Sequence, residues 1–214
     1  MSPAREVGGD FYDFFFTDQD HLALVIGDVS DKGVPAALFM MVAKTLIKNL
    51  AKLEKSPAQI FAHVNDQLCE NNEAGYFVTV WFALIDLRTG EGVAVNAGHE
   101  KPAVCRAGAS YELISNKHSL SLGVMSGIGF RENEFQMYPG DQVFVYTDGV
   151  PEAINKDNEQ FGTGRMLEVL NQNNDADPKT ILTRMKEEID AFAVDVPQFD
   201  DTTMLCFHYK GVKK

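Results

Sequence analysis

Aspartates at the ends of predicted strands are the residues of this sequence best placed to do chemistry. Each lies next to a run of apolar residues that is typical of a strand, and the set is Asp10, Asp28, Asp148 and the pair Asp200-Asp201. A carboxylate at the end of a buried strand is held still, as a site for a hard metal ion requires. These residues are far apart in the sequence, so only folding can bring them together. A cluster of bare like charges is unstable and would call for divalent cations.

The ligand atoms indicate which metal such a cluster would hold. Aspartate oxygens favour Mg²⁺ or Mn²⁺ over zinc, because no set of cysteines and histidines accompanies them. Two such ions about 4 Å apart could hold a hydroxide between them and stabilise an in-line displacement at phosphorus. Two alternatives stay open. The aspartates could be ordinary turn and cap residues, or they could bind calcium for stability, although the regular calcium-binding loop is absent.

The elements that must position these residues follow from periodicity and turn signals. Strands are expected over 11–16, 22–26, 76–87, 92–97, 103–106, 111–114, 130–137, 142–147 and 204–209. The strands 130–137 and 142–147 are expected to pair across the turn 138–141. Helices are expected from Pro35 to about Leu53, from Ser56-Pro57 to about Leu68, over 165–171 and after Asp177-Pro178, and a short helix is expected to start at 150–153. The run 76–87 is apolar on both alternating sets, which predicts a strand covered on both faces.

Composition limits the classes of function. The 214 residues carry a formal net charge of −12, which argues against a nucleic-acid partner. No apolar run approaches the length of a membrane span, and the N-terminus lacks the apolar core of a signal peptide. Three widely separated cysteines form no metal-type pair and indicate a reducing compartment, so we expect a cytoplasmic location. One domain over residues 1–214 is the simplest organisation.

Five motifs carry a resemblance to a known family. They are PAREVGGDFYD at 3–13, GDVSDKG at 27–33, NAGH at 96–99, YTDGVPE at 146–152 and DDTT at 200–203. In this order they resemble the bacterial metal-dependent serine/threonine phosphatases of the sporulation stage II protein E (SpoIIE) type. These are related to protein phosphatase 2C (PP2C) and include the general-stress sigma-factor regulatory phosphatases. The resemblance covers nearly the whole chain, and the five motifs together are far more specific than any one of them.

The resemblance implies a fold and a set of roles. The implied fold is α+β, a four-layer αββα sandwich in which two antiparallel β-sheets are flanked by helices. Asp28 would bridge two Mn²⁺ or Mg²⁺ ions, with the Val29 carbonyl on one of them. Asp148 and Asp200 would complete the shell of the second ion, and Asp10 would act directly or through water.

Three further residues are candidates for the same site. Arg5 corresponds to an arginine that contacts phosphate in the wider PP2C group. Asp201 is a second candidate beside Asp200, but the motif aligns the first aspartate of the pair with the metal ligand. His99 lies in a loop rich in glycine and proline, where it could contact a ligand or have a structural role.

The resemblance also implies a function. The chain would hydrolyse phosphoserine or phosphothreonine on a small regulatory protein of the anti-sigma-factor antagonist type, with metal-bound water as the nucleophile. The alternative is a catalytically weak signalling or binding module of the same fold. The chain starts almost on its first motif, so it resembles a C-terminal catalytic fragment that lacks an upstream regulatory region. A homodimer is also compatible with the sequence.

Overall fold

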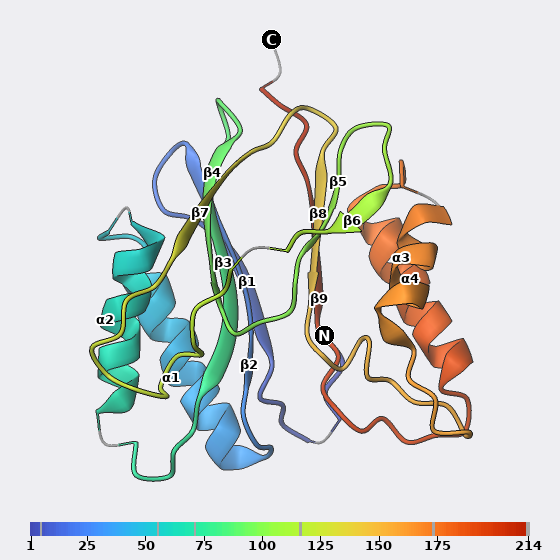
Figure 1. Cartoon of the computed structure of the whole chain (residues 1–214), viewed down its shortest axis with the longest axis horizontal. Helices are drawn as coiled ribbons and strands as arrows, with labels where there is room; N and C mark the ends of the chain where they lie inside the picture. Colours follow the sequence, from blue (N-terminus) through green and yellow to red (C-terminus); the bar gives the residue numbers. More distant parts are fainter. Residues whose placement is uncertain (5, 55, 71, 116, 173, 213–214) are drawn as a thin grey trace.

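The structure of the chain is a computed structural model, which describes residues 1–4, 6–54, 56–70, 72–115, 117–172 and 174–212. Two antiparallel β-sheets pack face to face, and a pair of helices covers the outer face of each sheet (Figure 1). The four-layer αββα sandwich that the sequence predicts is therefore confirmed, and the fold class is α+β.

The two sheets differ in size. The first has the order β1-β2-β3-β4-β7, with β1 (Phe11–Phe16), β2 (His21–Val29), β3 (Val78–Asp86), β4 (Glu91–Ala97) and β7 (Glu132–Gln136). Its outer face is covered by α1 (Val34–Leu50) and α2 (Pro57–Cys69). The second has the order β6-β5-β8-β9, with β5 (Ala103–Cys105), β6 (Tyr111–Leu113), β8 (Gln142–Tyr146) and β9 (Met204–His208). Its outer face is covered by α3 (Gly162–Gln172) and α4 (Pro178–Phe192).

Apolar side chains fill the spaces between the layers, and β3 contributes to two of them. Val80 and Phe82 pack toward α1 and α2, whereas Trp81 and Ala83 pack between the two sheets. Both alternating sets of this strand are buried, as its composition predicts. A strand packed on both faces is held stiffly, and so are the polar residues beside its ends.

Two helices begin with the side-chain caps that the sequence predicts. At the start of α2, the backbone N–H of Gln59 donates to Ser56 Oγ at 3.2 Å. At the start of α4, the backbone N–H of Lys179 donates to the Asp177 carboxylate at 3.0 Å. Each bond satisfies one of the N–H groups that a helix start leaves without an intrahelical acceptor.

The predicted hairpin between 130–137 and 142–147 is wrong. β7 pairs with β4 in the first sheet, whereas β8 pairs with β5 and β9 in the second. The turn itself exists, since the Asp141 N–H donates to the Tyr138 carbonyl at 2.9 Å. However, the Asp141 carboxylate also accepts the Ala107 N–H at 3.0 Å, which fastens the turn to the second sheet. A turn sequence specifies a local reversal but not the partner of the next strand, and here the chain crosses from one sheet to the other.

The prediction of a short helix that starts at 150–153 is also wrong. The Glu152 N–H donates to the Asp148 carbonyl at 2.8 Å, which makes a single turn. The Ala153 carbonyl then accepts the N–H of Phe161 at 2.7 Å and not that of a residue one helical turn further on, so no further helical turn is added. This compact turn keeps Asp148 and Glu152 on the same side of the chain.

One predicted helix is shorter than expected. α1 ends at Leu50 and not near Leu53, because the Leu53 N–H closes a turn onto the Leu50 carbonyl at 2.9 Å. The described part of the chain contains no helix with the length and apolar content needed to cross a membrane.

Candidate active site

The first sheet brings two of the predicted aspartates together. β1 and β2 are antiparallel, with Phe11 opposite Gly27, so Asp10 lies beside Asp28. Glycine is required at position 27, because a side chain there would start 2.6 Å from the Phe11 ring. The close approach of β1 and β2 therefore depends on Phe11 and Gly27, which are the neighbours of Asp10 and Asp28.

The second sheet brings the other two aspartates to the same edge of the molecule. β8 and β9 are antiparallel, with Tyr146 opposite Met204. Asp148 follows the first of these strands and Asp200 precedes the second. Their charges act on Asp28 in the first sheet, so the candidate site spans both sheets.

Asp28 is the carboxylate that the others crowd. Burial raises the pKa of Asp28 to about 9, and the negative charges of Asp10, Asp148 and Asp200 also raise it. All four aspartates predicted from strand ends thus interact through space. A carboxyl group in this position gains a proton or a cation far more readily than an exposed one.

Asp10 is almost fully buried, at 1% exposure. Its Oδ2 accepts the Thr147 hydroxyl at 2.8 Å, which links the start of β1 to the end of β8. Within the described residues, its Oδ1 is buried without a hydrogen-bond partner. Burial raises the pKa of Asp10 to about 6. One oxygen is therefore held by the Thr147 hydroxyl, and the Thr203 and Asp28 side chains also act on this carboxyl and lower its pKa.

Asp148 lies in an acidic environment that the sequence did not reveal. Burial raises the pKa of Asp148 to about 6, and the charges of Asp200, Glu152 and Glu100 add to the rise. Burial and the charge of Glu152 also raise the pKa of Glu100. Glu100 directly follows the motif NAGH, and Glu152 is the last residue of the motif YTDGVPE. Their places in or beside these motifs were the only signal in the sequence that could have identified them.

Asp200 is paired with a lysine that sequence reasoning did not single out. Lys32 Nζ lies 3.0 Å from Asp200 Oδ1 and donates to the Phe199 carbonyl at 2.6 Å. The same ammonium lies over the Phe199 ring, 4.3 Å from its centroid. Lys32 thus connects the loop after β2 to the loop before β9. Its place inside the motif at 27–33 was the available signal.

Asp201 has a different environment from its neighbour Asp200. Its Oδ1 accepts the Ala4 N–H at 2.7 Å, and its Oδ2 accepts the N–H groups of Gly9 at 2.8 Å and Asp10 at 3.4 Å. A side chain at Gly8 would start 2.3 Å from Asp201 Oδ2, so only glycine fits there. Both oxygens of this buried carboxylate are occupied, and they anchor the segment that carries Asp10.

His99 lies behind Asp28 and not at the surface. Its Nδ1 is 2.9 Å from Thr79 Oγ1, which in turn is 3.4 Å from the Asp28 carbonyl oxygen. Burial lowers the pKa of His99 to about 4, so the ring is neutral at neutral pH. Asn96 holds the loop, since its Oδ1 accepts the His99 N–H at 2.7 Å. This environment fits a positioning role better than direct contact with a ligand.

The two remaining predicted residues are Val29 and Arg5. The backbone at Gly9 passes close to the Val29 carbonyl: a Cβ atom at position 9 would lie 3.1 Å from that oxygen. Arg5, predicted to contact phosphate, lies outside the described residues, and its role stays a prediction.

The donor set fits a divalent cation in its chemistry. Within the described ranges, no three His, Cys, Asp or Glu side chains are close enough to form a ready-made metal cage. The available ligands are nonetheless all oxygens, which suits hard cations. A cation would also relieve the repulsion that raises the pKa of Asp28 and would give the buried Asp10 Oδ1 a partner.

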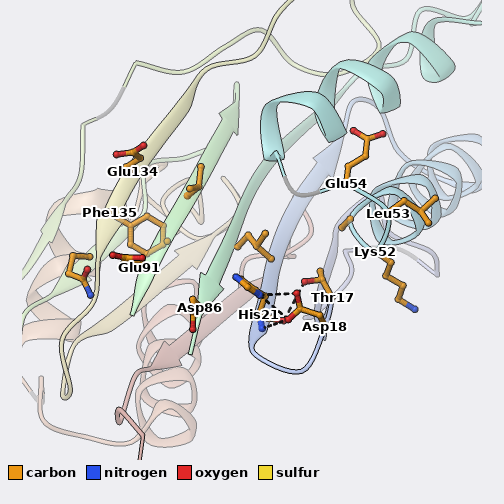
Figure 2. A pocket seen from close by; sticks show the side chains of 15 residues that line it. Thr17, Asp18, His21, Lys52, Leu53, Glu54, Asp86, Glu91, Glu134 and Phe135 are labelled. Carbon is orange, nitrogen blue, oxygen red and sulfur yellow. Dashed lines mark hydrogen bonds and ion pairs between the residues drawn. The ribbon is translucent and has the colours of Figure 1, made fainter. Parts of the chain in front are cut away.

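A cavity of about 980 Å³ lies at the opposite end of the first sheet (Figure 2). Its acidic lining residues are Asp18, Glu54, Asp86, Glu91 and Glu134. His21 and Lys52 also line it, and His21 Nδ1 lies 2.8 Å from Asp18 Oδ1. None of the predicted site residues lines this cavity, so it is separate from the candidate site.

Comparisons with known proteins agree with the resemblance that the motifs carry. The family model described as stage II sporulation protein E matches residues 18–210. The chain therefore belongs to the SpoIIE family. It is 32% identical to protein IcfG of Synechocystis over 236 residues, which cover 97% of this chain and 37% of that protein.

Two further comparisons identify the fold and a named relative. The chain superposes on the SiaA-PP2C domain of Pseudomonas aeruginosa with a TM-score of 0.86 and 21% identity, covering 97% of this chain and 83% of that one. It is 28% identical to phosphoserine phosphatase RsbU of Bacillus subtilis over 71% of this chain and 45% of that protein. The chain thus spans less than half the length of these curated relatives. The family is one of PP2C-type serine phosphatases, which are hydrolases that use divalent metal ions.

Proposed function

We propose that this chain is the catalytic domain of a phosphoprotein phosphatase that depends on divalent metal ions and hydrolyses phosphoserine or phosphothreonine. Membership of the SpoIIE family supports the reaction class. The observation that carries the proposal is the environment of Asp28, whose pKa is raised to about 9 by burial and by three neighbouring aspartates. A carboxylate crowded in this way is typical of a catalytic metal centre.

We further propose that two Mn²⁺ or Mg²⁺ ions bind here. Asp28, Asp148, Asp200 and the Val29 carbonyl would hold them, and Asp10 would contribute directly or through water. When bound, such ions polarise the phosphate oxygens and increase the acidity of water. The chain supplies the orientation, because the Thr147 hydroxyl holds one oxygen of Asp10 in place.

The remaining residues of the site have supporting roles in this proposal. Asp201 fastens the N-terminal segment and so keeps Asp10 beside Asp28. Lys32 balances part of the charge of Asp200. Neutral His99 and Thr79 support the backbone of Asp28 from behind.

The substrate of this proposal is a small phosphorylated regulatory protein of the anti-sigma-factor antagonist type. The similarity to a protein named phosphoserine phosphatase supports the phosphoserine part of this statement. A cytoplasmic location accompanies it, supported by free cysteine thiols at Cys105 and Cys206 that are buried inside the fold.

Hydrolysis of p-nitrophenyl phosphate by the chain, with Mn²⁺, with Mg²⁺ and with EDTA, tests the proposal. We expect turnover with at least one of the two metals and none in EDTA. A folded protein that binds Mn²⁺ but hydrolyses neither this ester nor a phosphoserine peptide would contradict it. That result would favour the alternative, a binding module of the same fold.

A further inference from the structure

We infer that a basic groove beside the candidate site binds an acidic segment of the phosphoprotein substrate, next to its phosphoserine; this inference rests on the proposed function. The groove has a volume of about 930 Å³. Its principal lining residues are Lys101, Lys117, His118, Leu120, Arg131 and Glu132, and we call it the basic groove.

The charge of the groove is opposite to that of the chain. The sequence has 31 acidic and 19 basic residues, yet Lys101, Lys117 and Arg131 gather here and are exposed. In the part of the chain that the structure describes, these three cations form no ion pair. A cluster of unpaired cations on an acidic protein attracts acidic partners selectively.

The one carboxylate of the groove is engaged elsewhere. Glu132 Oε1 accepts the Ser56 hydroxyl at 2.7 Å and the Ala58 N–H at 3.0 Å. These donors belong to the start of α2, where negative charge is favourable. Glu132 is therefore held at the helix end, and among the described residues it forms no ion pair with the cations of the groove.

The groove and the candidate site share one loop. The Ser119 N–H donates to the Asn96 carbonyl at 2.8 Å, and this bond joins the wall of the groove to the end of β4. The Asn96 amide donates to the carbonyl oxygens of His99 at 3.0 Å and Glu100 at 3.2 Å. The charge of Glu100 acts in turn on Asp148. Lys101, the next residue, lines the groove, so a single short loop connects the candidate site to the groove.

The lining favours a peptide over a nucleic acid or a lipid surface. Leu120, which is 54% exposed, and the partly buried Phe130 offer apolar contacts between the cations. A nucleic acid carries a charge at every nucleotide and would bring those charges against Glu100, Glu152 and Asp148 as well. A peptide can limit its carboxylates to the residues that lie in the groove. An anionic membrane would likewise bring its charges against the same carboxylates of the candidate site.

Binding of labelled peptides to the whole chain tests the inference. One fluorescein-labelled phosphoserine peptide carries glutamates on both sides of the phosphoserine, and a second carries glutamines instead. Fluorescence anisotropy with Mn²⁺ measures binding to the metal-loaded chain, and a parallel series in EDTA measures binding without hydrolysis. The groove variant is Lys117→Gln with Arg131→Gln. Its matched control is Lys179→Gln with Arg184→Gln, which removes the same charges from exposed positions on α4.

We expect the parent chain and the control to bind the acidic peptide about tenfold more tightly than the neutral one. The groove variant should lose most of that preference. Equal binding of both peptides by the parent would overturn the inference, as would an equal loss in the control. An oligonucleotide or an anionic vesicle that binds as tightly as the acidic peptide, and is lost in the groove variant, would also overturn it in favour of that partner.

Turnover of p-nitrophenyl phosphate separates this inference from the proposed function. This small ester does not reach the groove, so the groove variant should hydrolyse it at the parent rate. Loss of the acidic preference in a chain that shows no turnover would support the groove and contradict the phosphatase. Normal turnover with an unchanged preference would contradict the groove alone.

Discussion

The two ends of the first sheet both collect carboxylates, but the protein gives them opposite properties. At one end, Asp28 is half-buried and surrounded by other aspartates, and its pKa rises to about 9. At the other end, around the cavity of Figure 2, backbone N–H groups lower the pKa of Asp18 to about 2. Asp86 accepts the Arg88 N–H at 2.8 Å, and this bond lowers its pKa.

The two groups of carboxylates lie at opposite ends of the same pair of strands. β2 and β3 are neighbours, with Asp28 opposite Thr79 at one end and His21 opposite Asp86 at the other. Asp28 is the last residue but one of β2, and Asp86 is the last residue of β3; both strands are mostly apolar. The donors around Asp86 satisfy its charge in a solvent-exposed turn, whereas the residues around Asp28 leave its charge unsatisfied. Residue type therefore does not identify a candidate metal ligand, and its surroundings do.

The largest expected effect is on activity. Asp28→Asn should lower metal-dependent turnover of p-nitrophenyl phosphate about a thousandfold, because loss of a shared ligand removes several kcal/mol of stabilisation. Asp86→Asn, at the other end of the same strand pair, should leave turnover near the parent value. Comparable losses in the two variants would remove the distinction between the two ends.

The second effect is on stability. Asp201→Ala should lower the free energy of unfolding by about 3 kcal/mol, because three backbone N–H groups lose a buried charged acceptor. Urea denaturation measures this loss. Asp18→Ala removes a carboxylate that also accepts backbone N–H groups, but in an exposed turn, and should cost much less. The anchor role of Asp201 would be refuted by a loss no larger than that of the control.

The smallest expected effect has the opposite sign. The folded pKa of Asp28 lies above its ordinary value, so its ionisation opposes folding at neutral pH, and this cost fades as the pH falls toward 4. Asp28→Asn removes the cost and should raise the Tm in EDTA at pH 7.5 by roughly 3–6 °C. Asp86→Asn should lower the Tm, since the pKa of Asp86 is depressed. Thermal unfolding followed by circular dichroism measures both. A Tm for Asp28→Asn at or below that of the parent would show that the crowded carboxylates carry no such cost.

Local signals in the sequence were sufficient for several parts of the fold and of the candidate site. Ser56 and Asp177 cap helices as predicted, because a cap depends only on residues within one turn. Strand-end aspartates were recognisable for a similar reason, since each is defined by the apolar run beside it. The pairing of β7 with β4 was not predictable, because it depends on how the first sheet assembles and not on the turn that follows β7.

The division of roles between Asp200 and Asp201 shows the same limit within the site. The sequence offers two identical side chains next to each other. Only the fold brings the N–H groups of Ala4 and Gly9 onto Asp201 and the ammonium of Lys32 onto Asp200. These contacts join residues that lie nearly a whole chain length apart.

By itself, the sequence determined which residues could act, what family they resemble and which strand ends carry them, because these properties are written in residue type and spacing. Only the tertiary structure decided which carboxylates lie close together, which of them accept hydrogen bonds from the protein and which groove is connected to them. Burial, charge repulsion and hydrogen bonding depend on distances between residues remote in the chain, and those distances exist only after the two sheets have packed.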